Sequence, residues 1–227
     1  MIKISKAKSE SRKGVRSGSN GGSLSDEKSL IMSRIEDKEL SKVVHTRIPG
    51  ATYAISNTGP LISAFQSDSF QLLTRIFPTI FISTVCVAEL EKHGWKKEIK
   101  AVSPRLVIIK LSSREEKRAL AIARQISQHP DTNDPVPVNH LGESQAIVLS
   151  LRPENRDDML LLDELAPRAI AKQAGIKLSG FPGVLLLAVQ VGLISPEDLK
   201  KRLEICKEKG THYGAAFIKQ VYEMAKG

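Results

Sequence analysis

Apolar residues between positions 51 and 227 follow two patterns, one typical of buried strands and the other typical of helices. Short runs of aliphatic and β-branched residues alternate with longer segments in which apolar residues recur at every third or fourth position. Strands that alternate with helices favour the α/β class, with a mainly parallel sheet covered by helices on both faces. The predicted strands cover residues 52–56, 79–83, 106–111 (a strand or an edge segment), 158–163 and 176–179. The predicted helices follow Asn57 and cover residues 70–77, 84–94, 113–127, 141–151, 164–175, 181–193, 195–210 and 213–227.

Residues that favour helix ends and loops support these boundaries. Pro60 lies at or near the first turn of its helix, where a missing N–H costs nothing. Ser113 and Glu116 have the spacing of a capping box, which predicts the start of the helix at 113–127. Residues 129–139 are rich in Pro and Asp and predict a loop, and the next helix is predicted to start at Asn139 or His140.

Residues 1–50 differ in composition from the rest of the chain. The first 23 residues are mainly Ser, Gly, Lys and Arg without aromatic residues, so they cannot bury enough apolar area to become ordered. A helix is predicted to begin at Ser25 or Asp26 and to end before Pro49 and Gly50. We therefore expect a basic, largely flexible extension at 1–50 and one domain at 51–227, including the C-terminal helices.

The charge of the chain makes RNA a reasonable partner without proving it. The net charge is +9 and the pI is about 9.6. Residues 1–50 hold eleven Lys and Arg against six Asp and Glu, a net of +5, which leaves +4 for residues 51–227. Cys86 and Cys206 lack the spacing of a zinc site and are interpreted as reduced thiols in the core of a cytoplasmic protein. No apolar run is long enough to cross a bilayer, so we expect no membrane partner.

Four polar residues are predicted to meet at one edge of the sheet. Asn57 and Asp163 follow two of the predicted strands, and ligands of parallel sheets bind at the carboxyl ends of the strands. Glu89 and Glu143 are predicted near the starts of their helices and on the apolar faces, although carboxylates are seldom buried without a partner. Oxygen ligands of this kind suit Mg²⁺ or Mn²⁺ rather than zinc. Taken singly, each acid is more often a helix cap or a solvated residue near a helix start.

The order of four sequence blocks resembles the PIN-domain family, in particular the branch related to VapC-type toxin ribonucleases. The blocks are "ISNTGPLISAF", "FISTVCVAEL", "LGESQAIVLSL" and "LLLDELAPRAIAKQAGIKLSGFPGVLLLAVQVGLI", and the resemblance covers roughly residues 52–194. It implies a three-layer α/β/α fold and Mg²⁺- or Mn²⁺-dependent cleavage of RNA. It also implies an antitoxin protein as a partner and a homodimer. The metal positions of the family fall on Asn57, Glu89, Glu143 and Asp163, and the three carboxylates among them are the catalytic residues that the resemblance implies.

Asn57 departs from the family pattern, which has an acidic residue at this position. An Asn carbonyl can ligate Mg²⁺, but it contributes a dipole instead of a full charge and cannot act as a general base. The first hypothesis is therefore a metal-dependent ribonuclease, with Asn57 completing the site. The second is a weak or inactive PIN-like module that binds RNA or a protein partner. A third is a structural component that pairs through the apolar helix at 181–194.

Other residues are weaker candidates. Thr58 matches the small hydroxyl residue that often follows the first metal position of the family. Glu164 is an accessory ligand or an exposed acid, and Arg168 contacts a phosphate or, more simply, pairs with Glu164 or Asp163. The remaining candidates have plainer default interpretations. By default, His129 and His140 are idle loop histidines, Trp95 is a packing residue, and the lysines of residues 92–100 form a solvated basic face.

Overall fold

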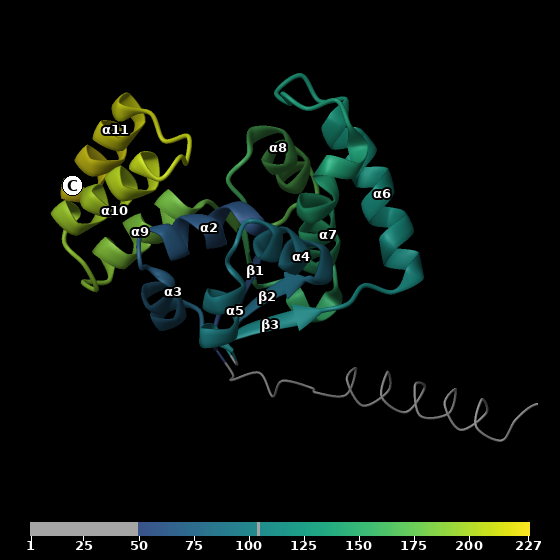
Figure 1. Cartoon of the computed structure of the whole chain (residues 1–227), viewed down its shortest axis with the longest axis horizontal. Helices are drawn as coiled ribbons and strands as arrows, with labels where there is room; N and C mark the ends of the chain where they lie inside the picture. The colour runs from purple at the N-terminus through teal and green to yellow at the C-terminus, as the bar shows by residue number, and fades with distance from the viewer. Residues whose placement is uncertain (1–49, 104) are drawn as a thin grey trace, which may run out of the picture. The chain divides into compact units, whose positions relative to one another are not determined.

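The computed structural model describes residues 50–103 and 105–227, so the predicted extension and its helix lie outside the described residues, apart from Gly50. Five parallel strands form one sheet in the order β3-β2-β1-β4-β5 (Figure 1). The predicted parallel sheet is confirmed, and each predicted strand contains an observed one. The strands are β1 (Ala54–Ser56), β2 (Ile80–Ser83), β3 (Leu106–Ile109), β4 (Met159–Leu161) and β5 (Leu178–Ser179).

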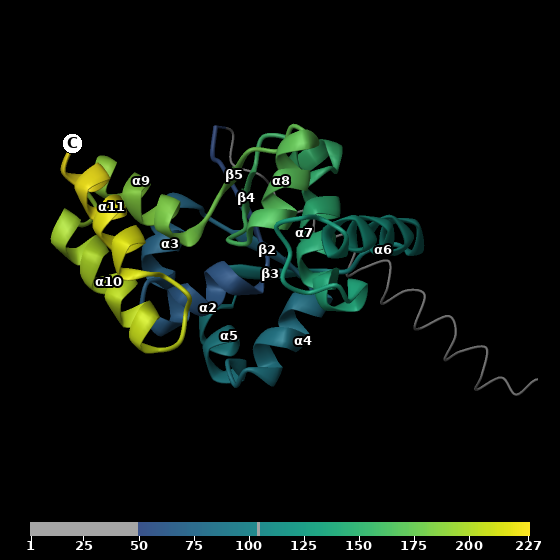
Figure 2. The ribbon, with the colours of Figure 1, turned by 90° about the horizontal axis from the view of Figure 1, so that it is seen from above.

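Helices cover both faces of the sheet, so the predicted three-layer α/β/α architecture is confirmed. Neighbouring strand residues point to opposite faces: Ala54 packs in one apolar cluster and Ile55 in the other. The first cluster joins the sheet to α2 (Thr58–Gln66), α3 (Phe70–Ile76), α4 (Thr84–Lys92) and α9 (Phe181–Gln190). The second joins it to α6 (Ser113–Ser127), α7 (Leu141–Ser150) and α8 (Leu165–Gln173), which lie together in Figures 1 and 2.

The last two helices extend the first cluster beyond the sheet. Leu199 and Leu203 of α10 (Pro196–Glu208) and Ile218 of α11 (Ala215–Lys226) are buried in it. Arg202 of α10 donates from Nη1 to the carbonyl oxygen of Ser67 at 3.0 Å, which ties α10 to the turn between α2 and α3. The C-terminal helices are therefore an integral part of the domain core.

The sequence failed to predict one helix and two short turns. Helix α5 (Lys96–Val102) occupies the segment that we interpreted as a basic surface, and Trp95 precedes it and packs against Phe65 with a ring-centroid distance of 5.6 Å. The packing role of Trp95 is thus confirmed. The predicted loop at 129–139 ends in a 3₁₀ turn, η1 (Pro137–His140). A second 3₁₀ turn, η2 (Pro153–Asn155), precedes β4. Among the described helices, none is long and apolar enough to cross a membrane.

The capping box of α6 is shifted by one residue from its predicted position. The side chain of Ser112, not Ser113, accepts the N–H of Glu115 at 3.4 Å. Glu115, not Glu116, returns the contact, because its Oε2 accepts the N–H of Ser112 at 2.8 Å. Both residue pairs have the same spacing, so the sequence pattern could not distinguish them.

This shift predicts unequal effects of two neighbouring substitutions. Ser112→Ala removes the acceptor for an N–H of the first turn and should lower the free energy of unfolding by about 1 kcal/mol. Ser113→Ala, inside the helix, should leave it nearly unchanged. Urea denaturation followed by circular dichroism measures both. An equal or larger loss for Ser113→Ala would contradict the observed cap.

Candidate metal centre at the carboxyl ends of the strands

Asn57 and Asp163 lie beyond neighbouring strands and face the same point. Strands β1 and β4 pair in parallel, and the N–H of Asn57 donates to the carbonyl oxygen of Leu161 at 3.2 Å. A Cβ atom built on Gly59 would lie 3.8 Å from Asp163 Oδ2 and 4.0 Å from Asn57 Oδ1. The side chain of Asn57 is 3% exposed, and its Oδ1 has no hydrogen-bond partner in the described part of the chain. A buried amide oxygen without a partner is uncommon and requires an explanation.

Asp163 is held in place by donors from the C-terminal part of the domain. Its Oδ1 accepts the N–H of Phe181 at 2.8 Å, at the start of α9, and its Oδ2 accepts the hydroxyl of Tyr213 at 3.3 Å. Burial raises the pKa of Asp163 to about 6, although the donors Phe181 and Tyr213 lower it. Gly180 allows this arrangement, because a Cβ at that position would lie 2.5 Å from Asp163 Oδ1. Asp163 thus caps α9, while α8 begins after Glu164.

Glu89 reaches the site from the second half of α4, not from the start of a helix as expected. The hydroxyl of Thr58, in the first turn of α2, donates a short hydrogen bond to Glu89 Oε2. The carboxylate lies against Gly142, where a Cβ atom would be 2.9 Å from Oε2 and 3.2 Å from Oε1. The absence of a side chain at residue 142 therefore lets α4 place its carboxylate beside the first turn of α7.

Glu143 is the buried acid of the site, as the sequence predicted. Its side chain is 8% exposed, and its Oε2 has no hydrogen-bond partner in the described part of the chain. Burial, followed by the charge of Glu164, raises the pKa of Glu143 to about 8, and the charge of Glu89 acts in the same direction. Three acids from three helical segments are thus close enough to affect one another.

His140 was expected to be an exposed loop residue, and this expectation is wrong. It is 4% exposed at the end of η1, and its Nε2 lies 2.8 Å from the carbonyl oxygen of Asp134. His140, Glu143 and Glu164 each offer one ligand atom, and these three atoms lie within 4.8 Å of one another. The spacing of three residues between His140 and Glu143 at a helix start was a usable signal. His129, by contrast, makes a local contact with Asp131 at 3.7 Å.

Arg168 does not form the expected ion pair. Among the described residues, no ion pair joins it to Glu164 or Asp163; its Nη1 donates to the carbonyl oxygen of Leu162 at 2.6 Å. Its charge still lowers the pKa of Asp163. Arg168 therefore fixes the backbone that precedes Asp163. Tyr213 was not recognised from the sequence as a site residue, because it is 50 positions from Asp163 and lies in no recognisable motif.

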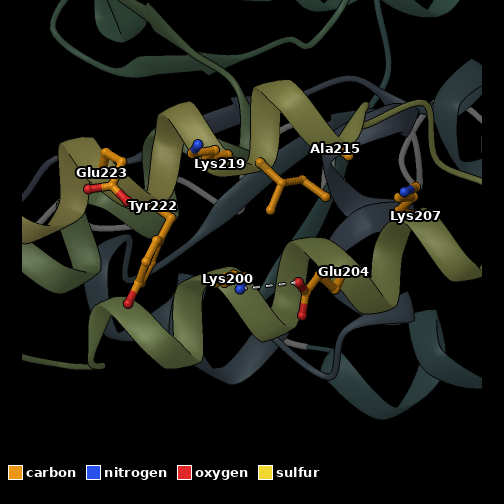
Figure 3. A pocket seen from close by; sticks show the side chains of 8 residues that line it. Lys200, Glu204, Lys207, Ala215, Lys219, Tyr222 and Glu223 are labelled. Carbon is orange, nitrogen blue, oxygen red and sulfur yellow. Dashed lines mark ion pairs between the residues drawn. The ribbon is translucent and has the colours of Figure 1, made fainter.

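A separate cavity of about 360 Å³ lies between α10 and α11. Figure 3 shows that its walls carry Lys200, Lys207 and Lys219 together with Glu204 and Glu223. Lys200 and Glu204 form an ion pair across 3.7 Å. None of the predicted site residues lines this cavity.

The raised pKa of Glu143 predicts how the stability of the metal-free protein depends on pH. The folded state holds a proton on Glu143 up to pH about 8, whereas the unfolded state releases it near the ordinary pKa of 4.5. The free energy of unfolding should therefore fall as pH rises through this window, by at most about 1.4 kcal/mol per pH unit for this group.

Glu143→Gln should flatten this pH dependence, because the amide has no proton to lose. Urea denaturation in the presence of a chelator, repeated across the window, measures the slope. Glu154→Gln, which changes an exposed acid, is the matched control and should retain the slope of the original chain. An identical slope in the Glu143→Gln variant would show that the pH dependence has another source.

The comparisons with known proteins agree with this architecture. A family model, DUF3368, described as a PIN domain, matches residues 53–227, a range that includes every residue of the candidate centre. No curated protein matches the chain. The PIN domain is a nuclease-type fold, and its members are generally dependent on divalent metals. Since the match covers more than half of the chain, the chain belongs to the PIN-domain family.

Proposed function

We propose that the protein is a divalent-metal-dependent ribonuclease that cleaves RNA phosphodiesters. The observation that carries the proposal is a pair of buried oxygen atoms, Asn57 Oδ1 and Glu143 Oε2, which have no hydrogen-bond partner in the described part of the chain. Asp163 lies beside Asn57, and Glu89 lies beside the first turn of α7, which carries Glu143. Buried polar atoms are nearly always satisfied by protein, water or an ion. All four side chains offer oxygen, which is the donor set of Mg²⁺ and Mn²⁺.

The residues of the chain fit such an ion in charge as well as in donor type. Burial raises the pKa of both Glu143 and Asp163, because it destabilises the ionised carboxylates. A nearby cation stabilises the ionised forms and offsets this effect. When bound, Mg²⁺ or Mn²⁺ supplies Lewis acidity at the phosphodiester and makes water more acidic. Asn57, Glu89, Glu143 and Asp163 would hold it.

Neighbouring residues orient the ligands before RNA arrives. Thr58 donates a hydrogen bond to Glu89, and Phe181 and Tyr213 donate hydrogen bonds to Asp163. These three hydrogen bonds restrict the rotation of the two carboxylates. Glu164 is exposed and close enough to affect Glu143, so it adds negative charge that favours a cation. The lysine and arginine residues outside the crevice would steer the RNA strand, which predicts binding that weakens with salt.

A second candidate function is a PIN-like module that binds RNA or a protein partner without turnover. Asn57 favours it, because an amide adds no charge to the ligand set and should weaken the affinity for a cation. The same substitution lessens repulsion among Glu89, Glu143 and Asp163 when no ion is bound. The two functions differ in whether RNA is cleaved.

Metal binding and RNA cleavage by three variants distinguish these functions. Calorimetry should show saturable Mn²⁺ binding to the original chain, lost in Glu143→Gln and retained in Glu154→Gln. Cleavage of a fluorescent RNA should depend on Mn²⁺ or Mg²⁺ and should fall at least ~10²-fold in Glu143→Gln. Asn57→Asp restores a charge and should tighten metal binding ~10-fold or more.

Three results of these experiments would contradict or change the proposed nuclease function. Binding of RNA without cleavage, in the original chain and in Asn57→Asp alike, would reject the nuclease and leave the binding module. Cleavage that appears only in Asn57→Asp would show that the amide alone disables the site. Cleavage that survives in Glu143→Gln would place the chemistry elsewhere.

The resemblance to VapC-type toxins extends the proposal to a biological role. The protein would act in the cytoplasm as a homodimeric toxin that an antitoxin protein inhibits. Induced expression of the chain alone in a bacterial host should then arrest growth, and Glu143→Gln should relieve the arrest. Normal growth at equal expression of the original chain would count against the toxin, but not against a stand-alone ribonuclease.

A further inference from the structure

His140, Glu143 and Glu164 bring three ligand atoms together where η1, α7 and α8 begin or end. His140 ends η1, Glu143 lies in the first turn of α7, and Glu164 precedes α8. One ligand atom from each lies within 4.8 Å of the others. An imidazole and two carboxylates form a donor set different from the four oxygen ligands of the proposed nuclease centre.

The hydrogen bond of His140 leaves one ring nitrogen with a free lone pair. A carbonyl oxygen can only accept, so Nε2 must carry the proton in the 2.8 Å contact with Asp134. In the neutral ring the lone pair is then on Nδ1. Histidines that bind metals commonly donate their other N–H to a carbonyl or carboxylate, which fixes the ring and its tautomer.

Asp134 is itself fixed, so the orientation of His140 does not depend on a single contact. The Oδ1 of Asp134 accepts the N–H of Val136 at 2.8 Å, and its Oδ2 accepts the side-chain amide of Asn139 at 2.8 Å. The segment 134–140 therefore folds around the Asp134 carboxylate and presents its carbonyl oxygen to the imidazole.

Glu143 and Glu164 supply the other two donors. The Oε2 of Glu143 is buried without a partner in the described residues, and its side chain is more than nine-tenths buried. Glu164 occupies the N-cap position of α8, but its side chain makes no capping hydrogen bond. Its exposed carboxylate can therefore close the cluster from the solvent side. A fully unpaired buried carboxylate oxygen is costly, and a cation removes that cost.

We propose that His140, Glu143 and Glu164 form a mixed nitrogen–oxygen subsite for a divalent transition-metal ion, with a preference for Mn²⁺, Co²⁺ or Zn²⁺ over Mg²⁺. Imidazole is a good ligand for these ions, whereas Mg²⁺ favours oxygen donors. The inference rests on the proposed function, because Glu143 belongs to both ligand sets. Two of its donors come from α7 and the N-cap of α8, so the subsite does not depend on the uncharged side chain of Asn57.

Pulsed electron paramagnetic resonance of the full chain with bound Mn²⁺ tests the subsite directly, because it detects a nitrogen bonded to the metal. The original chain should show the imidazole nitrogen, and His140→Gln should abolish this signal and weaken Mn²⁺ binding ~10-fold or more. Mg²⁺ binding should change little in that variant. His129→Gln, which removes the other histidine of the same loop, should retain both the signal and the affinity.

A second variant, Glu164→Gln, distinguishes the loss of a metal ligand from a folding defect. Gln at 140 can still donate to Asp134, and thermal denaturation checks that the variant folds. Glu164→Gln changes an exposed side chain, so it should keep the fold and still weaken Mn²⁺ binding. An unchanged Mn²⁺ affinity in Glu164→Gln would overturn the proposed ligand set.

Failure of the subsite can be distinguished from failure of the proposed function. An absent nitrogen signal in the original chain, with Mn²⁺ binding that Glu143→Gln abolishes, would overturn the subsite and leave the nuclease centre with oxygen ligands alone. A nitrogen signal that survives in His140→Gln would also overturn it. No Mn²⁺ binding by the folded original chain would overturn both proposals.

Discussion

Electrostatic repulsion between carboxylates that are poorly solvated is the constraint on which the candidate centre depends. Burial and the neighbouring charges of Glu164 and Glu89 both raise the pKa of Glu143, because ionised groups are stabilised less by protein than by water. The chain has two means of tolerating this arrangement without an ion. Glu143 can hold a proton, and Asn57 brings an oxygen without a charge. Each means lowers repulsion at the expense of affinity for a cation.

The elements that hold these acids come from nearly the whole domain. Helix α2 supplies Thr58 for Glu89, α9 supplies the N–H of Phe181 for Asp163, and the segment before α11 supplies Tyr213. The hydroxyl of Tyr213 is a donor at neutral pH, as in any tyrosine, and burial raises its pKa further above the ordinary range. Gly142 and Gly180 lack the side chains that would displace the carboxylates of Glu89 and Asp163. The site is therefore set by packing between helices as much as by the strand ends.

The sequence predicted the sheet and the buried acid Glu143, because both leave periodic signals. Alternating strands and helices required a parallel sheet, and Glu143 stood out as a charge on an apolar face. The sequence could not predict the burial of His140, because this burial depends on the turn that Asp134 stabilises. It placed Glu89 near a helix start and missed α5, whose residues are mostly charged and form no buried face. Pairings such as Tyr213 with Asp163 follow from tertiary packing and leave no local pattern.

The contact between Tyr213 and Asp163 has a consequence for the synthesis of the protein. Tyr213 follows α10, whereas every other side chain of the candidate centre lies at or before residue 168. A nascent chain therefore carries all the acids of the centre before the hydroxyl that orients Asp163 has left the ribosome. The complete centre therefore forms only after residue 213 has been synthesised, which is later than every acid that it contains.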